Sequence, residues 1–111
     1  MLRRRAGAAV VQWLARHFPP VRLPGGGPVW LVDARGVATA QVAAVVGDRL
    51  RRLDGTRLVA LVDDPRVDQL RSAGVAYEYV PAALAGSELE ARRKLITWTY
   101  GIEHSVLFTE L

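Results

Sequence analysis

The sequence contains no cysteine, and this absence removes several classes of chemistry at once. Disulfides, thiolate zinc sites and cysteine nucleophiles are excluded, and sulfur transfer is excluded with them. No stretch approaches the roughly 20 apolar residues that a membrane-spanning helix needs. Lys94 is the only lysine, so the net charge of +4 rests almost entirely on arginine. What is present is a chain of 111 residues, half of them apolar, which suits one domain with a single core.

Short apolar runs alternate with helical patterns along most of the chain. Apolar runs lie at 29–33, 58–63 and 75–80. The intervening and following segments have apolar residues at helical spacing, and a last strand is expected over 105–108. This alternation predicts a mostly parallel sheet of about four strands. We therefore expect one small three-layer α/β domain, Rossmann-like in its strand–helix rhythm, over residues 29–111.

Local signals set the expected helix ends. A first helix is expected over 39–53 and a second from the Asp64–Pro65 pair, with the Asp64 side chain as its cap. Gly74 ends that second helix. A third helix is expected over 88–100, where Ser87 and Glu90 have the spacing of a capping box and Gly101 follows the last turn.

The first 28 residues differ in composition from the rest. Residues 1–18 combine four arginines with Val10, Val11, Trp13, Leu14 and Phe18, which predicts a basic amphipathic helix. Two alternatives stay open for it: packing of the Trp13 face on the domain, or binding to an anionic membrane surface. Residues 19–28 are rich in proline and glycine and predict a linker.

Acidic residues follow two of the predicted strands. Asp33 ends the first run, and Asp63 and Asp64 end the second. Ligands of open parallel sheets bind beyond the carboxyl ends of the strands, so these carboxylates could hold a divalent cation or a ribose hydroxyl. The alternative is structural: Asp64 caps a helix and Asp33 caps a turn beside Arg35.

Glu78 lies inside the third predicted strand, on the opposite face from Tyr77 and Tyr79. It either faces water on an edge strand or pairs with Arg92 or Arg93 of the last helix. Basic clusters could attract phosphates, but no nucleic-acid module signature is present, so nucleic acid is not an expected partner. An exposed edge strand, together with Trp30 or Trp98 in an apolar patch, would favour a homo-oligomer.

The stretch from about residue 58 to 108 resembles the N-terminal regions of some bacterial cell-surface glycosyltransferases. The matching positions are a leucine-arginine-x-x-glycine turn, a glutamate-tyrosine-x-proline strand end, and an arginine-rich helix closed by tyrosine-glycine. In this chain they are Leu70, Arg71, Gly74, Glu78, Tyr79, Pro81, Arg92, Arg93, Tyr100 and Gly101. The resemblance implies a role in glycan synthesis, but the aspartate-x-aspartate metal motif of the sugar-transfer domain is absent here. It therefore implies an accessory module with a larger glycosyltransferase as partner.

These observations give one leading hypothesis and one alternative. The leading hypothesis is a non-catalytic cytoplasmic module, peripheral to the membrane or free of it, that binds a partner enzyme or a nucleotide-sugar-like ligand at the strand ends. The alternative is a small Mg²⁺-dependent enzyme or binding domain for a phosphorylated ligand. No complete catalytic motif is present, and no cofactor is indicated. The candidate ligand-binding residues are Asp33, Arg35, Asp63, Asp64, Glu78, Arg92 and Arg93.

Overall fold

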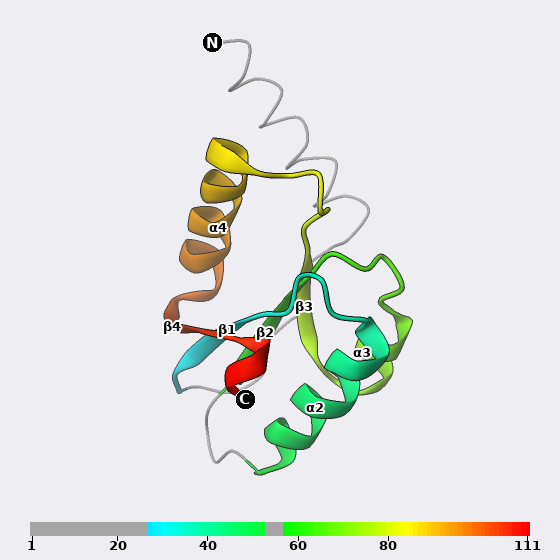
Figure 1. Ribbon diagram of the computed structural model, residues 1–111. Coiled ribbons are helices and arrows are strands. Elements are labelled where there is room, and N and C mark those ends of the chain that lie inside the picture. Colours follow the sequence, from blue (N-terminus) through cyan, green and yellow to red (C-terminus); the bar gives the residue numbers. More distant parts are fainter. Residues whose placement is uncertain (1–26, 53–56) are drawn as a thin grey trace.

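Four parallel strands form the centre of the fold in the computed structural model, which describes residues 27–52 and 57–111 (Figure 1). The strands are β1 (Val29–Asp33), β2 (Arg57–Val62), β3 (Ala76–Tyr79) and β4 (Ile102–Leu107). Their order in the sheet is β3-β2-β1-β4, and every neighbouring pair is parallel. The interior position of β2 agrees with its uninterrupted apolar sequence, since such a strand is covered on both faces. The expected small parallel α/β domain is confirmed.

The helices lie on both faces of this sheet. They are α2 (Thr39–Arg52), α3 (Asp68–Ser72) and α4 (Gly86–Tyr100), with a short 3₁₀ turn, η1 (Phe108–Glu110), at the end. The chain steps outward from β1 to β2 to β3, so right-handed crossovers place α2 and α3 on one face. The step from β3 back to β4 runs the other way and places α4 on the opposite face (Figure 1).

Each face of the sheet has its own core. On the α2 side, Val42 and Val46 lie one helical turn apart and pack in the cluster that contains Val32 and Ala60. On the α4 side, Ile96 packs in a cluster with Leu31 and other strand residues. All six side chains are fully or almost fully buried.

Three boundary predictions are wrong. The second expected helix begins at Asp68, with Val67 as its N-cap, so Asp64 does not cap it. The last helix begins at Gly86 and has no side-chain cap, so Ser87 and Glu90 form no capping box. The final strand starts three residues early, at Ile102, because pairing with β1 extends over residues whose polar character had hidden it.

The glycine predictions at two helix ends are confirmed. Gly74 has φ +71° and Gly101 has φ +63°, in the left-handed region that glycine adopts without strain. The expected edge strand is present, since β3 and β4 are the two edges of the sheet. Trp98 is 83% exposed, whereas Trp30 is half-buried against the His104 ring.

Two sequence predictions fall outside the described residues. These are the amphipathic helix over 1–18 and the linker up to residue 26. Within 27–52 and 57–111, no helix is long and apolar enough to cross a membrane.

Candidate functional site

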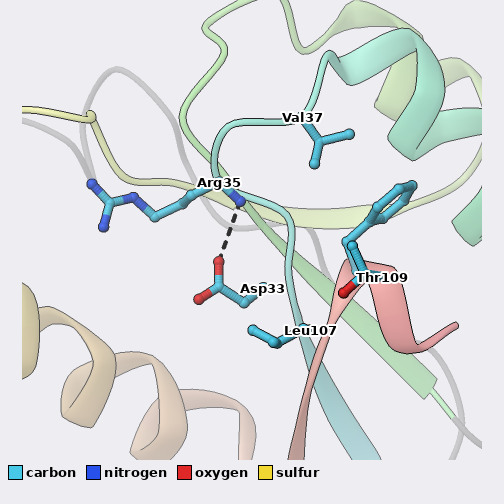
Figure 2. Close-up of a pocket in the computed structure, with 6 residues that line it drawn as sticks. Asp33, Arg35, Val37, Leu107 and Thr109 are labelled. Carbon is cyan, nitrogen blue, oxygen red and sulfur yellow. Dashed lines mark hydrogen bonds between the residues drawn. The ribbon is translucent and has the colours of Figure 1, made fainter.

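A pocket opens where the carboxyl ends of β1 and β4 lie side by side (Figure 2). β1 continues into α2 on one face of the sheet, whereas β4 is reached through α4 on the other. At such a switch point the connections diverge and leave a crevice, in which open parallel sheets bind ligands. The pocket has a volume of about 350 Å³. It is lined by Asp33, Arg35, Val37, Leu107, Phe108 and Thr109.

Asp33 supplies the acidic group of this pocket. It is the last residue of β1, and its Oδ1 accepts a hydrogen bond of 3.2 Å from the backbone N–H of Arg35 (Figure 2). Its Oδ2 accepts a hydrogen bond from the Arg93 guanidinium of α4. The Asp33 side chain remains 19% exposed and the Arg93 side chain 32% exposed. Because an ionised carboxylate has about four lone-pair positions, Asp33 can still accept hydroxyl donors from a ligand.

Arg35 belongs to the pocket mainly through its backbone. Its side chain points away from Val37 and Thr109 toward the loop that precedes α4 (Figure 2). There its NH2 group donates to three backbone carbonyls, at 3.0, 3.2 and 3.1 Å. The carbonyls belong to Pro81, Ala82 and Leu84. Arg35 therefore ties the end of β1 to the start of α4.

The acidic pair after β2 is engaged by the loop between β1 and α2. The Asp63 Oδ1 accepts a hydrogen bond of 2.8 Å from the Gly36 N–H. The Asp64 Oδ2 accepts from the Thr39 N–H at 3.2 Å, at the first residue of α2. In many α/β proteins the donors of this loop and helix end bind a phosphate. Here two carboxylates of the chain occupy such donors.

Asp64 is also paired with Arg66. The Arg66 side chain donates to both Asp64 carboxylate oxygens at 3.0 Å, and the Arg66 N–H adds a bond of 3.1 Å. These hydrogen bonds, first that of the guanidinium, hold the pKa of Asp64 well below its usual value of 3.8. The ionised Asp64 carboxylate therefore stabilises the fold at pH values above 3.8, and this stabilisation is lost as the pH falls below 3.8.

Asp64→Asn is therefore expected to destabilise the domain at neutral pH and to lose this effect in acid. We expect the difference in unfolding free energy between the two proteins to stay constant down to about pH 5 and to shrink below about pH 4. Urea denaturation followed by circular dichroism at several pH values measures it. Asp48→Asn, which removes an exposed carboxylate of α2, is the matched control. A difference that does not change with pH would show that the Asp64 charge is not responsible.

Glu78 is buried and paired with Arg92, the first of the two arginines proposed for it. Its Oε2 accepts from the Arg92 guanidinium at 2.7 Å, and its Oε1 accepts from the Tyr100 hydroxyl at 2.9 Å. The two charged side chains are only 4% and 6% exposed. Burial, followed by the nearby Glu78 charge, raises the pKa of Tyr100, so its hydroxyl keeps the proton that it donates. This group lies in the interior beneath α4 and outside the pocket lining.

The three acidic residues at the strand ends do not form a metal site. All three accept hydrogen bonds from the β1–α2 loop or the start of α2, and Asp33 also pairs with Arg93 of α4. Across the described ranges, no group of three or more histidine, cysteine, aspartate or glutamate side chains is placed to hold a metal ion.

Comparison with known proteins gave no match. No protein-family model, no curated protein and no solved structure is significantly similar to this chain.

Of the seven candidate ligand-binding residues, the pocket contains Asp33 and the backbone of Arg35, and Arg93 reaches it through Asp33. Four pocket residues were not anticipated: Val37, Leu107, Phe108 and Thr109. Predicting these four residues required the order of the strands. The last strand ends beside Asp33 only because it pairs with the first strand.

Proposed function

We propose that this chain is a non-catalytic α/β module that binds a nucleotide-sugar-like ligand in the pocket between β1 and β4, in the service of bacterial cell-surface glycan synthesis. The observation that carries the binding role is the position of the pocket at the switch point of a parallel sheet, with a carboxylate on its wall. The resemblance of residues 58–108 to bacterial cell-surface glycosyltransferases is the basis for proposing glycan synthesis as the process. Nucleotide sugars are made in the cytoplasm, which is where the proposal places the protein.

The chemistry of the lining favours a ligand with hydroxyl groups and a flat or apolar face. Asp33 accepts hydrogen bonds from sugar or ribose hydroxyls, and the Thr109 hydroxyl can donate or accept. Phe108 and Leu107 offer apolar surface to a ring. The half-exposed Arg93 guanidinium beside Asp33 adds a positive charge for a phosphate. A volume of about 350 Å³ is at the lower end of small-molecule pockets, so it fits one ring system better than a whole nucleotide sugar.

The absence of a free acid or base at the pocket supports a binding role over a catalytic one. Asp33 is held in an ion pair, and Glu78 is buried away from the lining. A general base must reach the reacting proton directly or through one water. Among the residues that line the pocket, Asp33 is the one carboxylate, and it is neutralised by Arg93.

Binding is tested by titrating ¹⁵N-labelled protein with UDP-glucose, and separately with UMP and with glucose. We expect the amide signals of residues 35–37 and 107–109 to shift, since they surround the pocket. A shift with UMP but not glucose assigns the pocket to the nucleotide, and the reverse assigns it to the sugar. If none of the three probes moves these signals, the ligand-binding proposal is wrong.

Asp33→Asn is expected to weaken the binding of the effective probe by about 10- to 100-fold, because hydrogen bonds to a charged acceptor contribute about 1.5–3 kcal/mol. The dissociation constant from the same titration is the measurement. Asp48→Asn, on the exposed side of α2, is the control and should bind as the wild type does. Asp63→Ala tests the Mg²⁺-dependent alternative. If that alternative holds, the substitution abolishes metal-dependent binding of the ligand.

The proposed partner is a larger glycosyltransferase, as the resemblance implies. Affinity capture with the tagged full-length chain, from membranes and from cytosol, tests this part separately. Recovery of a glycan-synthesis enzyme supports it. If that chain recovers no such enzyme, the partner proposal fails while the ligand proposal stands.

A further inference from the structure

The two edges of the sheet differ in how they are protected against pairing with another strand. β3 has four residues, Pro81 follows two residues after its end, and its charged Glu78 side chain is buried. Shortness, proline and an inward-pointing charge are devices by which natural sheets block an edge. β4 is six residues long and contains neither proline nor lysine. Its irregularity lies at its start, opposite Val29 and Trp30, so the rest of β4 is a regular strand.

β4 is also open on both faces of the sheet. The register places Ser105 and Leu107 on the α4 face, whereas His104 and Val106 lie on the α2 face. Ser105 and His104 are exposed and Leu107 is 53% exposed, so neither α4 nor α2 overhangs this part of the edge. Across the described ranges, β1 is the one strand that pairs with β4. The outer backbone groups of β4 are therefore left to water or to a further strand.

We propose that β4 pairs with β4 of a second copy of this chain, antiparallel and about a two-fold axis at Ser105. Two sheets of four strands then join into one continuous sheet. In a symmetric dimer both copies use the same patch, so that patch must be complementary to itself. β4 meets this condition in the register centred on Ser105.

The charges of the edge favour this symmetric pairing. In the proposed register Ser105 lies opposite Ser105 of the other copy, and His104 lies opposite Val106. Glu103 is the one carboxylate of β4. Its two copies would lie about 14 Å apart along the strands, which is beyond the screening length of about 8–10 Å. Like charges therefore do not face each other, and the two opposed serine hydroxyls can hydrogen-bond.

The size of the interface sets the expected affinity. A six-residue edge is about 20 Å long, which is small beside the interfaces of permanent dimers. We therefore expect a dissociation constant in the micromolar range. The pairing needs no ligand, so its test is independent of the proposed binding function.

Sedimentation velocity of the full-length chain measures the association, at concentrations from about 1 to 200 μM that bracket a micromolar dissociation constant. We expect a shift from the mass of the 12.2 kDa chain toward twice that mass. Ser105→Lys places two ammonium groups face to face at the axis and should weaken association by about tenfold or more. Ser72→Lys, at an exposed position of α3, adds the same charge elsewhere and should leave association unchanged. Circular dichroism should show the same fold for all three proteins.

The absence of cysteine allows a second test, which addresses the register. Opposed residues of antiparallel strands have Cβ atoms about 4.5–5.5 Å apart, close to the separation that a disulfide spans. Ser105→Cys should therefore form a covalent dimer under mild oxidation about tenfold or more faster than Ser72→Cys, because pairing raises the effective concentration of the two thiols. Equal rates for the two variants would contradict the register centred on Ser105.

A wild-type chain that stays monomeric at all these concentrations overturns the proposal. Rapid labelling of Ser105→Cys by a maleimide would then leave the edge to an extended segment of another protein. Slow labelling would mean that another part of this chain covers it. A dimer that Ser105→Lys does not weaken, or that Ser72→Lys weakens equally, also overturns the proposal, because the contact then lies elsewhere.

Discussion

Replacing Glu78 with alanine is expected to lower the free energy of unfolding by about 3–5 kcal/mol, which is the usual cost of leaving one member of a buried ion pair alone. Arg92 would lose its carboxylate while remaining almost fully buried, and the Tyr100 hydroxyl would lose its acceptor. A domain of this size is stable by about 5–15 kcal/mol, so the variant should be close to unfolding. Urea denaturation at low temperature measures the change.

Two further variants separate the ion pair from the loss of packing. Glu78→Leu combined with Arg92→Met replaces both charges by apolar groups and should recover most of the stability. Asp48→Ala removes an exposed partner of Arg51 and Arg52 and should cost less than about 1 kcal/mol. If Glu78→Ala costs no more than Asp48→Ala, the pair is not buried in solution.

The choice between Arg92 and Arg93 as the partner of Glu78 could not be made from the sequence. Adjacent residues of a helix point about 100° apart, so only the rotation of α4 about its axis decides between them. Arg92 and Ile96 lie one turn apart on the buried side, which places Arg92 over Glu78. Arg93 turns toward β1 and meets Asp33. Both arginines are used, each by a different strand.

The first three strands were predictable because their apolar runs are local signals. The hydrogen-bond partners of the acidic residues were less predictable, because several of the donors lie far away in the sequence. Asp64 precedes a proline and has the local pattern of a helix cap, but the Thr39 N–H and the Arg66 guanidinium bind its carboxylate. The pocket was only half predictable, since Phe108 and Thr109 belong to the 3₁₀ turn η1, which follows an edge strand of mixed polarity.

Arg35→Ala is expected to destabilise the domain by about 2–3 kcal/mol, because three carbonyls that share one charged donor would lose it together. These carbonyls belong to Pro81, Ala82 and Leu84, which lie in the connection between β3 and α4. Arg35→Lys should restore less than half of the loss, since an ammonium group is a compact donor on a flexible chain and lacks the planar fork of a guanidinium. Urea denaturation gives the energies.

The matched control is Arg49→Ala, which also removes an arginine that donates to a backbone carbonyl. Arg49 donates to the Leu111 carbonyl at 2.6 Å on the exposed surface, so its loss should cost less than about 1 kcal/mol.

Hydrogen exchange then locates the effect of Arg35→Ala. Faster exchange at residues 84–89, where α4 begins, with no change in β2, would show that Arg35 anchors this helix locally. Because α4 carries Arg93 to Asp33, the same variant should weaken ligand binding at the pocket. Equal losses of stability for the two alanine variants would contradict the anchoring role.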